Sequence, residues 1–436
     1  MYPTLRGTLV LLLAAPVIAL GTWLPALGWL ALALIAFIVG VLAADYRAAD
    51  PIDSFEISRQ NDTKLSLGDD NPVRLRVRSL RRRTTTFWLR DEPPADFRVS
   101  QRILTGQVRP RQVWDGMYTV KPIERGDYTF GDINLRWLGP LGLVVRQGKV
   151  KAAAPVKVYP SLLDVRRYDL LLRRNRLQEV GLRNARLFGQ GSEFERLREY
   201  LSDDEYRRIN WKATARRNRP ITVEYQTERS QNIMCVMDIG RMMQSPVAEI
   251  AKLDYVVNAV LLLGYVSTGM GDRVGMMTFA DDVGAYLAPR LGRKQFYTML
   301  ELLYGVRPQP IEPDYRRAIA YLAARQRKRA LTVIFTDLSG GQAMQTLVQH
   351  AALLARSSLP LIVTISDPDI HAAAHLRPAD SAGAYQRSAA AQLLDERRLT
   401  LDALRQRGVL TLDVPAHQLS WSVINRYLEL KGRGQL

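Results

Sequence analysis

The chain has 436 residues, enough for two or three domains at about 150 residues per domain. Hydrophobic residues make up 47% of it, which excludes a disordered chain, and 61 basic against 43 acidic side chains leave a formal net charge of +18. One cysteine, Cys235, excludes a disulfide scaffold and a thiolate zinc cluster, and four histidines leave few candidates for general bases or nitrogen ligands.

The chain begins with a long apolar run. No charged residue lies between Gly7 and Ala44, and one helix over these positions would be about 57 Å long, almost twice the hydrocarbon thickness of about 30 Å. A cleaved signal peptide would have a shorter apolar core, of about 7–15 residues. We therefore predict a two-helix transmembrane hairpin in residues 1–46, with a turn near Trp23 and Pro25.

The charges that flank this run set its expected orientation. Arg6 precedes the first span and Arg47 follows the second, whereas the turn between the spans carries no charge. The positive-inside rule then places both ends of the hairpin, and the soluble domains that follow, in the cytoplasm.

Residues 47–160 are expected to form a small β-sandwich-like domain. Val73-Arg74-Leu75-Arg76-Val77-Arg78 alternates apolar and basic residues, as in a strand with one buried face. Further short strands are predicted near 87–90, 111–120, 127–130, 133–137 and 156–159, with Gly, Pro and Asp between them. The row of arginines is interpreted as the solvent side of an edge strand rather than as a nucleic-acid surface.

Residues 161–230 are rich in arginine and are predicted to form a helical connector. Ser202-Asp203-Asp204-Glu205 has the form of a capping box, which would open a helix that continues through Lys212.

Residues 231–436 alternate apolar runs with helical patterns, which indicates parallel strands joined by crossover helices in a doubly wound α/β domain. Strands are expected at 233–237, 273–279, 331–336, 360–366 and 409–412, and helices near 247–267, 294–304, 315–327, 342–356, 385–407 and 421–430. Ligands of such folds bind outside the carboxyl ends of the strands. Asp238 and Asp337 follow two of the predicted strands and are therefore the candidate site residues.

The chain resembles the bacterial membrane proteins of the domain of unknown function 58 family, whose carboxyl-terminal half is similar to a von Willebrand factor type A domain. The resemblance is carried by Gly191-Ser192-Glu193-Phe194 through Arg207-Arg208-Ile209-Asn210-Trp211-Lys212-Ala213-Thr214-Ala215-Arg216, by Arg125-Gly126-Asp127-Tyr128 with Gly139-Pro140-Leu141-Gly142-Leu143, and by Asn425-Arg426-Tyr427-Leu428-Glu429. It implies a multi-pass protein of the cytoplasmic membrane. It also implies work with a MoxR-type AAA+ ATPase in a chaperone-like assembly system, because family members are commonly encoded beside such ATPases.

The resemblance further implies a magnesium site, which this sequence retains only in part. Type A domains use an Asp-x-Ser-x-Ser loop, a threonine and a second aspartate, but here the loop reads Asp238-Ile239-Gly240-Arg241-Met242 and the threonine position falls near Pro313. Two aspartates with water could hold magnesium weakly. The expectation that we favour is that Asp238 and Asp337 cap loops or pair with Arg241, so that no cofactor is required.

Other signals for chemistry are weak. His371 and His375 are four residues apart, but the glutamate of a zinc-protease motif is missing and the run near Pro368 is expected to be a loop. No phosphate-binding loop and no hydrolase triad is readable, so we predict that the chain is not an enzyme.

Two functions of different classes remain. The first is a membrane-anchored protein-interaction module, whose candidate partner-binding residues are Arg207, Arg208, Trp211, Lys212 and Arg216. The motif around Trp211 either contacts the ATPase or locks the two soluble domains together, and internal packing is the interpretation that we favour, because Trp and Arg also serve domain cores and their rims. The second is binding to nucleic acid or anionic lipid, driven by the charge of +18, although the bases are spread along the chain and no specific nucleic-acid motif is present.

Overall fold

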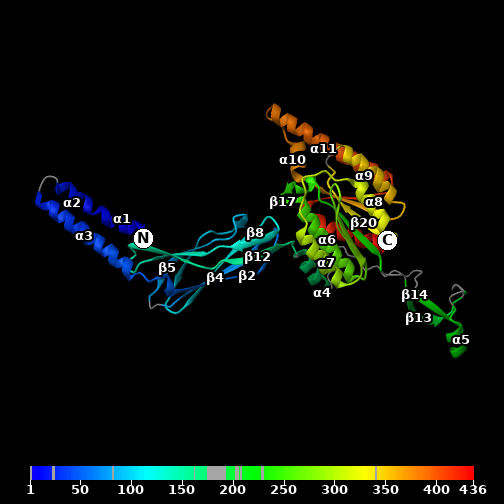
Figure 1. The fold of residues 1–436 in the computed structure, drawn as a ribbon, viewed down its shortest axis with the longest axis horizontal. Coiled ribbons are helices and arrows are strands. Elements are labelled where there is room, and N and C mark those ends of the chain that lie inside the picture. Colours follow the sequence, from blue (N-terminus) through cyan, green and yellow to red (C-terminus); the bar gives the residue numbers. More distant parts are fainter. Residues whose placement is uncertain are drawn as a thin grey trace. The chain divides into compact units, whose positions relative to one another are not determined.

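The computed structural model of the chain describes residues 2–21, 25–80, 83–161, 163–173, 193–201, 206, 209–226, 230–338 and 341–436. The chain divides into two compact units, Met1–Ser161 and Leu162–Leu436. Together they make a mixed α/β protein with an apolar N-terminal helix and several sheets (Figure 1).

The first unit starts with three apolar helices, α1 (Leu5–Leu12), α2 (Ala14–Gly21) and α3 (Pro25–Ala48). They pack together through small and aliphatic side chains, among them Ala14, Ile38 and Leu42. Within α3, Gly28–Ala48 is long and apolar enough to cross a membrane, whereas Leu5–Ala19 is apolar but shorter. One candidate span is therefore present in the described residues, and the two-helix transmembrane hairpin stays a prediction.

The rest of the first unit is β-structure. Its strands are β1 (Tyr2–Pro3), β2 (Phe55–Asn61), β3 (Lys64–Ser66), β4 (Asn71–Ser79), β5 (Thr85–Asp91), β6 (Phe97–Val99), β7 (Leu104–Val108), β8 (Val113–Pro122), β9 (Gly126–Phe130), β10 (Ile133–Leu138), β11 (Val144–Val150) and β12 (Ala154–Tyr159). They form sheets ordered β1-β11-β10-β5-β7, β2-β4-β8-β6 and β3-β12-β9. All pairs are antiparallel except β3 with β12, and each strand predicted in this region is present.

Strand β4 shows why the alternating pattern was informative. Val73, Leu75 and Val77 are fully buried, while the arginines between them face away from the core, and Arg76 pairs with Asp115 at 2.8 Å. The position predicted for this strand was wrong, because β4 lies between β2 and β8 and is not at an edge. Its arginines are accommodated by cross-strand acids instead of by an open edge.

The second unit is built around a six-stranded sheet of order β19-β18-β15-β20-β21-β22. These strands are β15 (Asn232–Asp238), β18 (Arg273–Phe279), β19 (Val283–Arg290), β20 (Leu331–Phe335), β21 (Leu359–Ser366) and β22 (Leu410–Pro415). Five of them run parallel, and β19 is an antiparallel edge strand. The predicted strands are confirmed, and β19 was not anticipated.

Helices cover both faces of this sheet (Figure 1). One face carries α4 (Leu163–Arg173), α6 (Lys252–Gly269), α7 (Arg293–Gly305) and α12 (Leu419–Gly432); the other carries α8 (Tyr315–Arg325), α9 (Gly341–Leu354) and α11 (Ser381–Gln406). In β15, Ile233, Cys235 and Met237 pack on the first face, and Met234 and Val236 on the second. Burial on both sides explains why this strand reads as one continuous apolar run.

The helical connector predicted for residues 161–230 is helical in α4 and near Trp211, but it also contains a two-stranded antiparallel ribbon that was not predicted, β13 (Glu193–Glu199) with β14 (Ile221–Gln226). The helix α5 (Trp211–Arg217) begins only after Asn210, whose side chain caps it by accepting from the Ala213 N–H at 3.0 Å. The capping box of residues 202–205 lies outside the described residues.

The segment with the two histidines is also helical rather than a loop. Helix α10 (Pro368–His375) is capped by Asp367, which accepts from the Asp369 N–H at 3.0 Å, and Pro368 occupies its first turn. A proline is well tolerated there because its missing N–H has no partner within the helix. Asp367 followed by Pro368 is therefore a helix-start signal in the sequence, and the expected loop was wrong.

Candidate functional site

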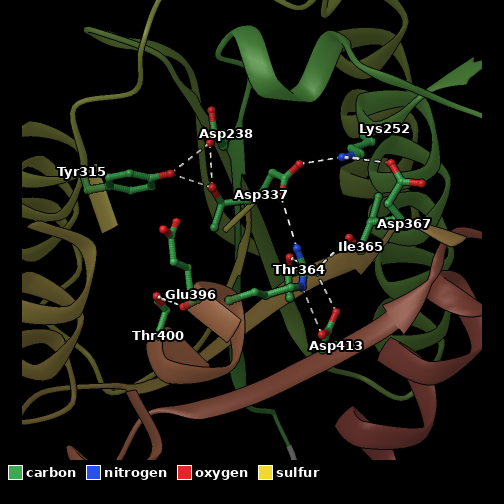
Figure 2. Close-up of polar contacts among 12 residues, drawn as sticks. Asp238, Lys252, Tyr315, Asp337, Thr364, Ile365, Asp367, Glu396, Thr400 and Asp413 are labelled. Atoms are coloured by element: carbon green, nitrogen blue, oxygen red, sulfur yellow. Dashed lines mark hydrogen bonds and ion pairs between the residues drawn. The ribbon is translucent and has the colours of Figure 1, made fainter. Parts of the chain in front are cut away.

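The candidate site lies at the carboxyl edge of the parallel sheet, where Asp238 ends β15 and Asp337 follows β20 (Figure 2). The strands are neighbours in the sheet, so their ends bring the two aspartates together as the topology predicted. Both side chains are buried. Each therefore needs hydrogen bonds or opposite charge to remain in the interior.

The carboxylate of Asp238 accepts hydrogen bonds from uncharged donors that belong to three different segments of the chain. The Gly240 N–H donates to Oδ1 at 2.7 Å, the Thr336 hydroxyl donates to Oδ2 at 2.7 Å, and the Tyr315 hydroxyl lies 3.3 Å from Oδ2. Tyr315 and Thr336 are also hydrogen-bonded to each other at 2.7 Å. Burial raises the pKa of Asp238 from 3.8 to about 6, against the opposing effect of these hydrogen bonds.

Asp337 is held by two cations. The ammonium of Lys252, the first residue of α6, lies 2.6 Å from Oδ2, and the guanidinium of Arg397 on α11 lies 3.3 Å from Oδ1. The Lys252 side chain is only 4% exposed and that of Asp337 only 1%. This is an ion pair in the interior, where screening by water is weak.

Arg397 joins this pair to the neighbouring strand ends. Its guanidinium donates to Asp413 at 2.8 Å, to the Thr364 hydroxyl at 2.6 Å and to the Ile365 carbonyl at 2.7 Å (Figure 2). Lys252 also lies 3.9 Å from Asp367, the cap of α10. The cluster therefore ties β20, β21 and β22 to helices α6 and α11.

The residues present do not fit a magnesium ion. Both oxygens of Asp238 accept protein donors, and Asp337 faces an ammonium at contact distance, which would repel a divalent cation. Among the residues that the structure describes, no group of three or more His, Cys, Asp or Glu side chains could hold a metal ion. The hydroxyl ligands that the resemblance would require are replaced by Gly240, Met242 and Pro313.

Of the two predicted alternatives, loop capping is confirmed for Asp238, which accepts the Gly240 N–H at 2.7 Å. Pairing with Arg241 was wrong, since Arg241 pairs with Glu312 at 2.8 Å on the surface. Four further residues of the site were not predicted from the sequence: Lys252, Arg397, Tyr315 and Thr336. Only Thr336 carried a signal, because it stands beside Asp337. Lys252 and Arg397 reach Asp337 from 85 and 60 residues away in the sequence, so only the fold could identify them.

A groove of about 480 Å³ lies beside this cluster, between α9 and α11. Its lining includes Leu338, next to Asp337, and the apolar side chains of Met344, Val348 and Leu399. Leu399 is 69% exposed. The groove thus brings apolar surface to the same edge of the sheet.

The candidate partner-binding residues belong to a different element, the ribbon with α5. Arg207 and Arg208 lie outside the described residues. Trp211 opens α5 with 59% of its surface exposed, and its ring lies 5.6 Å from that of Tyr206, which is 69% exposed. Lys212 and Arg216 are exposed on the same short helix.

Comparisons with known proteins point to the same family as the sequence motifs. The family described as "Protein of unknown function DUF58" matches residues 196–370. Uncharacterized protein YeaD of Bacillus subtilis is 29% identical over 218 residues, 47% of this chain and 52% of that protein. Uncharacterized protein Rv1480 of Mycobacterium tuberculosis is 28% identical over 154 residues, 35% of this chain and 49% of that protein.

Solved structures are more distant. Proximal thread matrix protein 1 from the mussel byssus has a TM-score of 0.31 at 9% identity and covers 46% of each chain. The CARDB domain of the PF1109 protein from Pyrococcus furiosus has a TM-score of 0.18 at 13% identity and covers 24% of this chain and 86% of that domain. Neither value is high enough to assign a shared fold. The chain spans about half the length of the curated relatives it matches, and its residues 196–370 are similar to the DUF58 family.

Proposed function

We propose that this chain is a membrane-anchored protein-interaction module, without catalytic activity of its own, that works with a MoxR-type AAA+ ATPase in the assembly or maturation of other proteins. In this proposal the N-terminal helices form a two-span hairpin in a bacterial cytoplasmic membrane. Both soluble units face the cytoplasm, and the second unit is a von Willebrand factor type A-like domain with a degenerate metal site.

The lengths of the helices support the anchor. Helix α3, with 24 residues, is about 36 Å long at 1.5 Å per residue, which exceeds the hydrocarbon thickness of about 30 Å. Helices α1 and α2 together run from Leu5 to Gly21, or about 25 Å, and pack along α3. A second span of that length is a few ångströms short, a mismatch that local thinning of the bilayer accommodates.

The observation that carries the interaction proposal is the exposed aromatic pair Tyr206 and Trp211 beside the cations of α5. Tryptophan, tyrosine and arginine are the residues that most often dominate protein interfaces. An aromatic pair in which more than half of each residue's surface is exposed gains much from being covered by a partner. Residues 196–370, which match the DUF58 family, include this element, and that family resemblance is what suggests the ATPase as partner.

The carboxyl edge of the sheet supports binding that does not depend on metal. Lys252 and Arg397 already neutralise Asp337, so no ion is needed to keep this carboxylate in the interior. Partner binding should therefore survive chelation of divalent cations, apart from any nucleotide requirement of the ATPase itself.

The test is a binding titration of the purified full chain, held in lipid nanodiscs, against the MoxR-type ATPase of the same organism. Trp211→Ala should weaken binding by about 30-fold, the effect of losing about 2 kcal/mol at a hot spot. Tyr297→Ala is the matched control, since Tyr297 is 61% exposed on α7 and lies outside the ribbon and α5. Equal affinity of the wild type and Trp211→Ala would contradict the proposed contact.

A second candidate function, binding to nucleic acid or anionic lipid, is favoured by the net charge of +18. Retention of DNA that falls steeply with salt would support the nucleic-acid form of this candidate.

A further inference from the structure

The ends of the apolar helices are joined to the β-structure of the first unit by one buried carboxylate. Asp45, in the last turn of α3, is 1% exposed and accepts the backbone N–H groups of Leu141, Leu143 and Val144 at 2.8, 3.0 and 3.0 Å. These N–H groups belong to the turn between β10 and β11 and to the start of β11. The turn is thereby fixed against the helix.

Two further contacts make this junction rigid. A Cβ atom at Gly139 would lie 2.6 Å from the Asp45 oxygens, so only glycine lets the turn approach the carboxylate this closely. From the other helix, the Thr4 hydroxyl donates to the Gly142 carbonyl at 2.8 Å, and β1 pairs with β11. The start of α1, the end of α3 and the β10–β11 turn therefore share one position along the helix axis.

This geometry sets the depth of the turn in a bilayer. The stretch that is apolar enough to cross a membrane runs to Ala48, so Asp45 lies inside it. Leu141 is bonded to Asp45 through its backbone and is 60% exposed, and so its side chain lies at the depth of the last turn of the span. An exposed leucine at that depth meets the boundary between acyl chains and headgroups.

Arginines lie just beyond Leu141, on the side away from the bilayer centre. Arg146 donates to the Ala49 carbonyl at 2.9 Å, four residues past Asp45, which places its guanidinium about 6 Å farther from the bilayer centre than Leu141. It lies 5.0 Å from the ring of Tyr46, and Arg136 lies 5.8 Å from the ring of Tyr2. Arginine and tyrosine at the end of a span are typical of the level of the lipid phosphates.

The charge near this level is mostly positive. Arg6 is in the first turn of α1 and Arg47 in the last turn of α3, beside Arg136 and Arg146 on the adjoining strands. We name these four residues the arginine collar. The first 50 residues contain two acids, Asp45 and Asp50. The carboxylate of Asp45 is buried and accepts hydrogen bonds from backbone N–H groups of the β10–β11 turn. The collar can therefore attract the phosphates of anionic lipids.

We propose that the β10–β11 turn inserts Leu141 into the membrane interface and that the arginine collar binds the headgroups of anionic phospholipids. This surface fixes the first unit on the bilayer rather than leaving it to swing on a flexible stalk. The proposal rests on the membrane anchor of the proposed function and adds the lipid class and the residues that recognise it.

Insertion of the turn is tested by fluorescence quenching on the full chain. The native Cys235 is fully buried and its pKa is raised to about 12, so a cysteine introduced by Leu141→Cys is labelled selectively with bimane. In nanodiscs whose lipids carry a nitroxide near the top of the acyl chain, this label should be strongly quenched. Met117→Cys is the matched control, because Met117 is 59% exposed on β8 of the other large sheet, and its label should remain bright. Equal quenching at the two positions would overturn insertion.

Lipid selectivity is tested by electron spin resonance of spin-labelled phosphatidylglycerol and phosphatidylcholine around the full chain in mixed vesicles. The wild type should enrich phosphatidylglycerol, and Arg136→Gln and Arg146→Gln should each reduce the enrichment by about fivefold. Arg74→Gln, at an exposed arginine of β4, should leave it unchanged. An unchanged enrichment in both collar variants would overturn the lipid assignment. So would loss of DNA binding in those variants with the lipid signal intact, since the collar would then recognise nucleic acid.

The outcomes separate this inference from the anchor on which it rests. If alkaline carbonate extracts the chain from membranes without detergent, the anchor itself fails. If the chain stays in the membrane but Leu141→Cys is not quenched and lipid enrichment is independent of the arginines, only the collar and turn assignment fails.

Discussion

Lys252→Met tests whether the ammonium at the carboxyl edge of the sheet is what keeps Asp337 in the interior. Methionine retains the length of the side chain but leaves a carboxylate that is only 1% exposed, with the Arg397 guanidinium 3.3 Å away. Breaking a buried ion pair on one side costs about 3–5 kcal/mol, and the remaining guanidinium places the expected loss near the lower end, at about 3 kcal/mol. For a unit of this size that loss lowers Tm by about 6–12 °C.

Scanning calorimetry of the full chain measures this shift, and hydrogen exchange in β20 assigns the transition to the second unit. Lys294→Met is the matched control, because Lys294 is an exposed lysine in the first turn of α7, and it should change stability by less than about 0.5 kcal/mol. Adding Asp337→Asn to Lys252→Met should restore part of the loss by removing the uncompensated charge. An unchanged Tm in Lys252→Met, or a wild type stabilised strongly by millimolar magnesium, would refute the role assigned to the ammonium.

Three further outcomes are expected. Because burial raises the pKa of Asp238 from 3.8 to about 6, the folded state between these values holds a proton that the unfolded state has released. Stability should therefore fall by about 2 kcal/mol as pH rises from 4 to 6, and Asp238→Asn should abolish this slope in pH-dependent unfolding. Cys235, whose pKa burial raises to about 12, should react with Ellman's reagent only after denaturation; rapid reaction of the native chain would contradict its position in β15. Asp45→Asn removes an oxygen that accepts turn N–H groups, which should cost about 1–3 kcal/mol and speed hydrogen exchange at Leu141 and Leu143; unchanged exchange would contradict the junction.

Much of the fold could be predicted because single strands and helices carry their own periodicity. The alternation in Val73–Arg78 encodes a strand with one buried face, and the unbroken apolar run of β15 encodes a strand covered on both sides. The edge position assigned to β4 was wrong because strand order depends on distant partners that local periodicity does not encode.

The ribbon β13–β14 could not be predicted from the sequence for a different reason. Its first strand, Glu193–Glu199, has acids and bases at spacings that also fit a salt-bridged helix, and the bulge between Phe194 and Arg196 breaks the period of two. At the site, Asp238 and Asp337 could be predicted from the sequence because each directly follows an apolar strand. Lys252 and Arg397 were not, because a lysine or arginine on a helix usually faces water and only the packing of α6 and α11 turns these two inward.

The most direct test of the central claim is photo-crosslinking in living cells with p-benzoylphenylalanine in place of Trp211. We expect a crosslinked product that contains the MoxR-type ATPase and remains in the membrane after alkaline carbonate washing. Crosslinks confined to the chain itself, or a chain recovered from the soluble fraction, would contradict a membrane-anchored platform that uses this aromatic surface to bind its partner.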